Sequence, residues 1–139
     1  MAFNLNLSGN FALTSGLFTR LAGAAVVTTN FVHPNALQTI TQTAGTCVGI
    51  MNWNVGSTVT TNTLQLLSNI DLGCAASPFT VNQNAILDCG TFVISGSTAA
   101  FTLSNTAPGA TFITANPDGI ELTGAFGSIQ TTGTRTFSA

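Results

Sequence analysis

Charge is the scarcest property of this 139-residue chain. Only 4% of its residues are charged, lysine is absent, and the two basic residues are Arg20 and Arg135. Binding to nucleic acid or to anionic lipid depends on clustered cationic side chains that contact phosphates. With a formal net charge of -2, the sequence predicts a protein that binds no nucleic acid and has no polybasic membrane anchor.

Long apolar runs are missing as well. The longest run, Leu21–Val27, is far shorter than the ~20 residues that a membrane-spanning helix needs. The first ten residues, MAFNLNLSGN, have neither the basic nor the apolar region of a signal peptide. We therefore expect no membrane insertion, and either export by another route or a mature segment that carries an added Met.

Residues that bind metals or act as nucleophiles are few and scattered. The single histidine, His33, precedes a proline, and the three cysteines, Cys47, Cys74 and Cys89, form no Cys-x-x-Cys pair. The cysteines allow one disulfide with a leftover thiol, or three free buried thiols that act as small apolar side chains. The sequence thus predicts no metal site and no cofactor.

The residues that are abundant favour strands. Threonine is the most frequent type, and asparagine, serine and glycine are common. β-Branched residues suit a half-buried sheet surface, which predicts an all-β fold whose exterior is wetted by hydroxyl and amide groups. A surface with so little charge does not repel a second copy, so we expect self-association through unprotected sheet edges.

The spacing of short apolar strands indicates a repeat. Phe79–Val81, Phe101–Leu103 and Ile120–Leu122 share an apolar-polar-apolar pattern at intervals of about 19 to 22 residues. Coils of this length bury their apolar sides by stacking and place irregular residues at corners. The pattern predicts a right-handed parallel β-helix, with an antiparallel β-sandwich or jelly roll as the alternative.

The chain is expected to form a single all-β domain over residues 1–139. Repeat-like coils are predicted over 41–139, and the looser segment 1–40 is a candidate cap or edge region in which Leu17–Val26 is compatible with a short helix. Asn116–Gly119 is a strong local hairpin signal. In register with the repeated triplets, however, it is better interpreted as a coil corner.

Three stretches carry a family resemblance: TQTAGTCVGIMNWNVGSTVTTNTLQLLSNIDLG, FTVNQNAILDCGTFVISGSTAAFTL and ANPDGIELTGAFGSIQTTGTRTFSA. Over Thr41–Ala139 the chain resembles the β-helix segments of large secreted bacterial surface and adhesin-like proteins. The insertion TAPGAT departs from their pattern by adding a corner at Pro108. The resemblance implies right-handed parallel β-helices that serve as stalks and contact surfaces, without catalytic residues.

Acidic residues are the remaining candidates for chemistry. Asp118 and Glu121 lie three residues apart across a turn, but a surface turn does not supply the contrast of environments that acid–base catalysis requires. Asp71 and Asp88 occur in the similar phrases NIDLG and ILDCG, which predicts that they stack at one corner of successive coils and bond to its backbone. We therefore expect turn-forming roles, and no enzyme.

Two features suggest ligand contacts. Trp53 would form a sugar-stacking platform if it were exposed, although its apolar neighbours favour a core position. The runs TITQT, TVTTNT and TTGTRT would form an ice-binding array only if they shared one register in consecutive coils.

The sequence as a whole predicts a structural, self-assembling protein. We expect an extracellular or cell-surface filament, stalk or adhesin module whose copies associate through exposed β-edges. Its partner is another copy of the chain, with a glycan or surface ligand as a further candidate. The alternative function is a carbohydrate- or ice-binding β module.

Overall fold

The computed structural model describes residues 3–19, 26–34, 36–48, 51–56, 61–73, 77–104, 106–120 and 126–137, without the side chains of residues 47 and 48. Over these residues the chain forms sixteen β-strands and no helix. The prediction of an all-β fold is confirmed.

The strands form four sheets. The largest has six strands in the order β1-β4-β7-β10-β13-β16. Its members are β1 (Phe3–Leu7), β4 (Val27–Phe31), β7 (Met51–Val55), β10 (Phe79–Val81), β13 (Phe101–Leu103) and β16 (Arg135–Phe137).

The other three sheets complete the sides of the coils. The five-stranded sheet contains β2 (Phe11–Leu13), β5 (Leu37–Gln42), β8 (Thr63–Leu66), β11 (Ile86–Asp88) and β14 (Thr111–Ile113). The three-stranded sheet contains β9 (Ile70–Asp71), β12 (Ile94–Gly96) and β15 (Ile129–Thr131). The two-stranded sheet pairs β3 (Leu17–Thr19) with β6 (Thr46–Val48).

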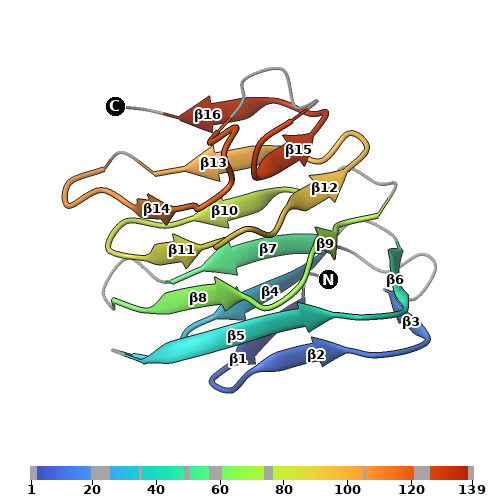
Figure 1. Ribbon diagram of the computed structural model, residues 1–139. Helices are drawn as coiled ribbons and strands as arrows, with labels where there is room; N and C mark the ends of the chain where they lie inside the picture. Colours follow the sequence, from blue (N-terminus) through green and yellow to red (C-terminus); the bar gives the residue numbers. More distant parts are fainter. Residues whose placement is uncertain are drawn as a thin grey trace.

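Within each sheet the neighbouring strands are parallel, and each strand pairs with the strand three positions later in the chain. Such an order is that of a β-solenoid, and it excludes the antiparallel sandwich. In Figure 1 the front strands run left to right, the rear strands run right to left, and the coils ascend toward the C-terminus. The winding has the right-handed sense that parallel crossover connections nearly always take.

The core consists of columns of apolar side chains that stack from coil to coil. Trp53, Phe79 and Phe101 occupy one register position of the six-stranded sheet, and the rings of Phe79 and Phe101 lie 6.0 Å apart with an angle of 11° between their planes. Ile70, Ile94 and Ile129 form a second buried column across the three-stranded sheet. Burying each such side chain stabilises the fold by roughly 1.5–3 kcal/mol, and a single coil could not bury it alone.

One corner is closed by a buried polar pair. Gln38 donates through Nε2 to the carbonyl oxygens of Leu7 (2.9 Å) and Gly9 (2.7 Å) in the coil before it. Its Oε1 accepts a hydrogen bond from Nδ2 of Asn62 in the coil after it (3.3 Å). Because buried amides are costly unless they are bonded, these contacts fix the alignment of three consecutive coils.

The register confirms one predicted repeat and corrects another. Phe79–Val81 and Phe101–Leu103 pair residue for residue, as their shared pattern predicts. The strand that follows in this sheet is Arg135–Phe137, so the expectation for Ile120–Leu122 is wrong. The stretch of chain between β13 and β16 is longer than that between earlier strands of this sheet, and Ile120 lies in a bend between β14 and β15. Residues 121 and 122 lie outside the described residues.

The Asn116–Gly119 segment is a coil corner. Phe112, before the turn, pairs parallel with Leu87, and β15 after it pairs parallel with β12. The Asn116 side chain accepts a hydrogen bond from the Asp118 backbone N–H (3.0 Å), and the Gly119 N–H donates to the Asn116 carbonyl oxygen (2.9 Å). The strong local turn signal is therefore real, but the turn joins neighbouring sides of a coil.

The segment proposed as a cap or edge region contributes complete strands to the coils. β1 pairs with β4 over five residues, and β2 and β3 pair with β5 and β6. Leu17–Thr19 is extended, so these residues do not begin a helix, and residues 20–25 lie outside the described residues. β1 and β2 are the outermost strands of their sheets, which places this segment at one edge of the stack.

Candidate functional surfaces

Among the described residues, no strand pairs with the outer side of β1 or of β16, so both ends of the six-stranded sheet are parallel edges. β1 is its first strand and β16 its last. The Phe3 N–H donates to the Val26 carbonyl oxygen (3.4 Å), and the Leu7 carbonyl oxygen accepts from the Val32 N–H (3.1 Å). Since backbone groups alternate in direction along a strand, the N–H and C=O groups of Asn4 and Asn6 face away from the sheet.

The N-terminal end also exposes apolar side chains. Phe3 is 53% exposed, Leu5 is 37% exposed, and Leu17 of β3 is 68% exposed. Two coils later, the counterparts of Phe3 and Leu5 are Met51 and Trp53, and both are fully buried. The residues of the first coil are thus of the kind that a neighbouring coil covers elsewhere in the stack.

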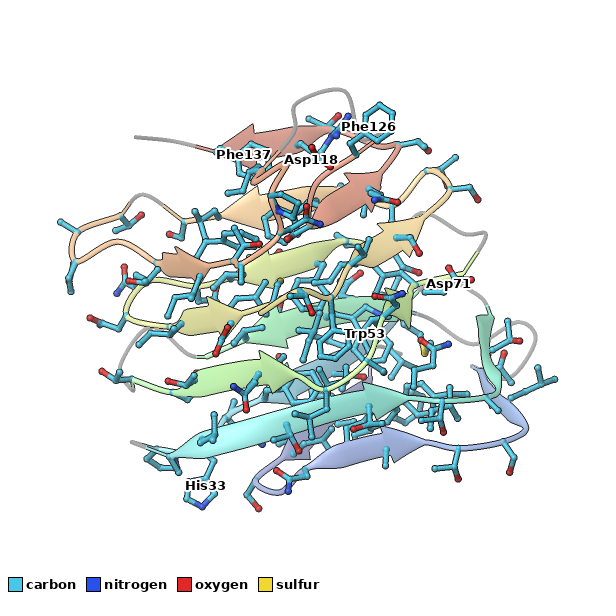
Figure 2. The ribbon with its side chains drawn as sticks, in the orientation of Figure 1. His33, Trp53, Asp71, Asp118, Phe126 and Phe137 are labelled. Atoms are coloured by element: carbon cyan, nitrogen blue, oxygen red, sulfur yellow. The ribbon has the colours of Figure 1, made fainter. Side chains whose placement is uncertain are left out.

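At the opposite end, likewise, no described strand pairs beyond β16. Phe137 is the last member of the column that contains the fully buried Phe31, Val55 and Val81, and Phe126, in the bend before β15, is 64% exposed. Figure 2 shows both side chains at the C-terminal end of the stack, above the buried layers. Each end therefore presents strand edges together with apolar groups.

The outer face of the six-stranded sheet is a regular array of amides and hydroxyls. One outward column contains Asn6, Asn30, Asn54, Thr80, Thr102 and Thr136. Asn54 donates through Nδ2 to Oδ1 of Asn30 (2.9 Å), and Asn30 donates in the same way to Asn6 (2.8 Å). These bonds form a side-chain ladder that runs along the stack.

Sequence reasoning missed this ladder. It singled out the threonine runs, whereas the in-register column begins with asparagines at a spacing of 24 residues. The available signal was the recurrence, at that interval, of an Asn directly before an apolar residue in NLNL, TTNF and NWNV. Strict periodicity of one polar residue, rather than a run of them, marks a ladder.

Trp53 lies inside the stack and offers no surface. Its side chain is 0% exposed and stacks on Phe31, with ring centroids 6.3 Å apart and an angle of 15° between the ring planes. Phe11 and Phe18 pack against the same ring at 5.8 Å. The exposure that a sugar platform requires is therefore not met, and the core position that its apolar neighbours favour is the one observed (Figure 2).

Asp71 and Asp88 do not stack on one another. Asp71 pairs with Ser95 in the three-stranded sheet, whereas Asp88 lies in the five-stranded sheet beside Gln65. Each carboxylate accepts a hydrogen bond from the N–H two residues later, at 2.9 Å in Asp71 and 3.0 Å in Asp88. The shared phrase encodes the same local Asp-x-Gly turn at two different corners, and the prediction of stacking is wrong.

The other acidic candidates are not brought together into a described site. Asp118 is exposed in its turn, and Glu121 lies outside the described residues. Over the part of the chain that the structure describes, there is no pocket and no cluster of three or more metal-binding side chains. In the same part of the chain, no helix is long and apolar enough to cross a bilayer.

Cys89 is a free, buried thiol. Burial raises its pKa to about 12, and the neighbouring Asp88 carboxylate acts in the same direction. A thiol held neutral in this way behaves as a small apolar side chain. Cys74 and the side chain of Cys47 lie outside the described residues, so a disulfide between them stays a prediction.

Comparison with known proteins gave no match: no family model, no curated protein sequence and no solved structure resembles the chain closely enough to be identified. The fold class is therefore established by the structure, and function has to be inferred from the open ends and the outer faces of the stack.

Proposed function

We propose that this chain is a structural module that assembles end to end through its open β-edges into a filament or stalk. The observation that carries the proposal is the pair of open edges on the six-stranded sheet, together with the exposed apolar side chains of the first coil. A parallel edge that carries unused N–H and C=O groups is a template for another strand.

The β1 edge lacks two features that normally prevent such pairing, whereas the β16 edge carries one charge, Arg135. The sequence of β1, FNLNL, contains no charge and no proline. Edge strands that stay unpaired usually carry lysine, proline or a bulge, or lie under a covering segment. With only 4% charged residues in the chain, long-range repulsion between copies is weak.

Sedimentation velocity and light scattering of the 139-residue chain over a range of concentrations test this proposal. We expect species that grow with concentration, and linear particles in negative-stain images. A single monomeric species at all concentrations would contradict it.

A matched pair of proline variants makes the test specific. Asn4→Pro removes an N–H that faces away from the sheet, and it should reduce assembly while the protein stays folded. Thr28→Pro, one strand inward, should destabilise the fold itself, because the alternation directs the Thr28 N–H toward β1. Equal assembly of wild type and Asn4→Pro would argue against the β1 edge.

The location outside the cell or on its surface belongs to the same proposal. It is supported by the resemblance to secreted surface proteins and by an exterior of amides and hydroxyls. Protease digestion of intact cells that produce the protein tests it, because a surface-displayed chain is cleaved while cytosolic markers survive.

The outward column of asparagines and threonines, Asn6 to Thr136, favours a second candidate function. This function is the binding of ice or a glycan at the outer face of the six-stranded sheet. Six strands present polar groups there in one register. A thermal-hysteresis assay and a glycan array test this candidate, with Thr80→Arg as the variant that disrupts the array without entering the core. Activity that survives this substitution would exclude the ladder as the binding face.

A further inference from the structure

The columns of the six-stranded sheet define what a following strand must present. One inward column runs Leu7, Phe31, Val55, Val81, Leu103 and Phe137, and it is apolar throughout. The next inward column begins at Leu5 and ends at Arg135, and the outward column between them begins at Asn6 and ends at Thr136. The last strand and the first therefore carry matching residue types in two of these three columns, and in the third column Arg135 would meet Leu5.

The backbone groups at the two edges are also complementary. Throughout the sheet, each residue whose side chain faces the core uses its backbone N–H and C=O to bond to the following strand. There it bonds to the two residues on either side of its register partner. The Phe31 carbonyl oxygen accepts from the Gly56 N–H at 2.9 Å, and the Phe101 N–H donates to the Thr134 carbonyl oxygen at 3.0 Å. At the C-terminal edge, the backbone N–H and C=O groups of Arg135 and Phe137 point the same way as those of Phe101, away from β13. In a further strand they would bond to the backbone groups of Asn4 and Asn6 that face away from β4.

The asparagine ladder has a direction that points across the same junction. Each amide NH₂ donates toward the N-terminal end, from Asn54 to Asn30 and from Asn30 to Asn6. Asn6 accepts through Oδ1, so the same geometry turns its NH₂ toward the place of a preceding coil. In that coil, the residue in this column would be Thr136, whose hydroxyl oxygen can accept the bond.

The other sheets do not continue in this way. In the five-stranded sheet, the register runs from β14 through β11 and β8 to residues 37–39 of β5, so β14 shares their columns. At the other end of the sheet, the register of β2 with β5 places residues 8–10 in those columns, and these residues form a corner and no strand. β15 and β3 belong to different sheets. Among the strands that the structure describes, those of the six-stranded sheet alone can extend in register from one copy to the next.

We propose that β16 of one copy pairs in parallel with β1 of a second copy, with Arg135 opposite Leu5, Thr136 opposite Asn6 and Phe137 opposite Leu7. The inference rests on the proposed end-to-end assembly and specifies its contact. The junction continues one apolar column, extends the asparagine ladder and directs Arg135 toward the position of Leu5.

A charge test at position 5 probes this register. Leu5→Lys would place a cation against Arg135 of the neighbouring copy, and we expect association at least about tenfold weaker. Leu5→Glu would place an anion there, and association should be retained or strengthened at low salt. The double variant Leu5→Lys/Arg135→Glu should recover assembly relative to Leu5→Lys. Sedimentation velocity measures association, and circular dichroism checks that each variant is folded.

Cross-linking tests the same register without a change of charge. Asn6→Cys in one copy and Thr136→Cys in another would lie roughly 5 Å apart between Cα atoms, within disulfide range. Asn4→Cys with Thr136→Cys is the matched control, since two residues along the strand increase the separation to roughly 8 Å. Mass spectrometry of oxidised mixtures should find the 6–136 linkage and not the 4–136 linkage.

The outcomes separate this inference from the proposed function. If wild type assembles but Leu5→Lys and Leu5→Glu behave alike, or the 6–136 linkage is no more frequent than the 4–136 linkage, the register is wrong while assembly stands. If wild type stays monomeric, end-to-end assembly fails and this contact fails with it. Opposite effects of Lys and Glu, together with the 6–136 linkage, support the register.

Discussion

The environment of the single tryptophan leads to a prediction about stability. The Trp53 ring is buried between Phe31, Phe11 and Phe18. Its Nε1–H is buried and has no hydrogen-bond partner among the described residues. The residue therefore combines a large apolar contact with an unsatisfied donor, and two substitutions can separate these effects.

The expected changes in the free energy of unfolding follow from the area that the Trp53 ring buries and from the cost of burying its Nε1–H without a partner. A tryptophan buries about 150–250 Å², so Trp53→Ala should lower the free energy of unfolding by about 3–5 kcal/mol. Trp53→Phe loses on the order of 1 kcal/mol for the smaller ring, but it also removes a buried donor whose burial costs about 1–3 kcal/mol. We therefore expect Trp53→Phe to lie within about 1 kcal/mol of wild type.

Urea unfolding followed by far-ultraviolet circular dichroism measures both effects. Phe79→Leu is the control, because it reduces a fully buried ring that has no polar atom. If Trp53→Phe costs nearly as much as Trp53→Ala, the Nε1–H makes a stabilising hydrogen bond and the reasoning is refuted. A small cost for Trp53→Ala would refute the core position of the ring.

Two further predictions concern backbone space and pH. Gly56→Ala should lower the free energy of unfolding by about 2–5 kcal/mol, because the added Cβ would lie 2.6 Å from Cβ of Ala85 and 2.8 Å from Oδ1 of Asn62. Gly16→Ala is the control, since its φ is nearly the same (77° against 76°) but no atom lies within 4 Å of the added Cβ, and it should lower that free energy by only about 1–2 kcal/mol. Equal losses for the two variants in urea unfolding would contradict this prediction. For Cys89, whose pKa rises from 9.0 to about 12, the folded state keeps a proton that the unfolded state loses, so stability should fall by about 1 kcal/mol between pH 8 and pH 10. The chain has no tyrosine or lysine, and the other groups that ordinarily titrate in or near this range, Cys47, Cys74 and the N-terminal amine, remain in a Cys89→Ala variant. A loss of stability in that variant as large as in wild type would contradict the assignment to Cys89.

The fold could be predicted from the sequence to the level of a stacked parallel coil. The match of Phe79–Val81 with Phe101–Leu103 is visible as a repeat, because each coil must present an apolar-polar-apolar strand at the same place. The match of Phe101 with Arg135 is not visible, because a long corner separates the strands and Arg135 breaks the apolar pattern. Register across an irregular insertion depends on which side of the coil the chain returns to, and sequence spacing does not record this.

The candidate surfaces were predictable only in general terms. Low charge and β-rich composition predict open, adhesive edges, but they do not identify which strands form them. Asp71 and Asp88 share a phrase because both form an Asp-x-Gly turn, and the phrase does not reveal that the turns lie on different sides of the coil. The asparagine ladder leaves a signal in the 24-residue recurrence of Asn, but its hydrogen bonds are recognised once three strands are aligned by their backbone pairing.

The sequence by itself determined the all-β class, the coil corners and the shortage of charge, because these depend on local alternation, turn chemistry and composition. Tertiary structure decided which residues share a column and showed that the first and last strands of one sheet match in two columns, while it confirmed the core position that the neighbours of Trp53 favour. Stacking brings together residues 22 positions apart or more, as in the pairing of Phe79 with Phe101 and, at 24 positions, the Asn6–Asn30 bond. Their contact is a property of the register and not of any local stretch of the chain.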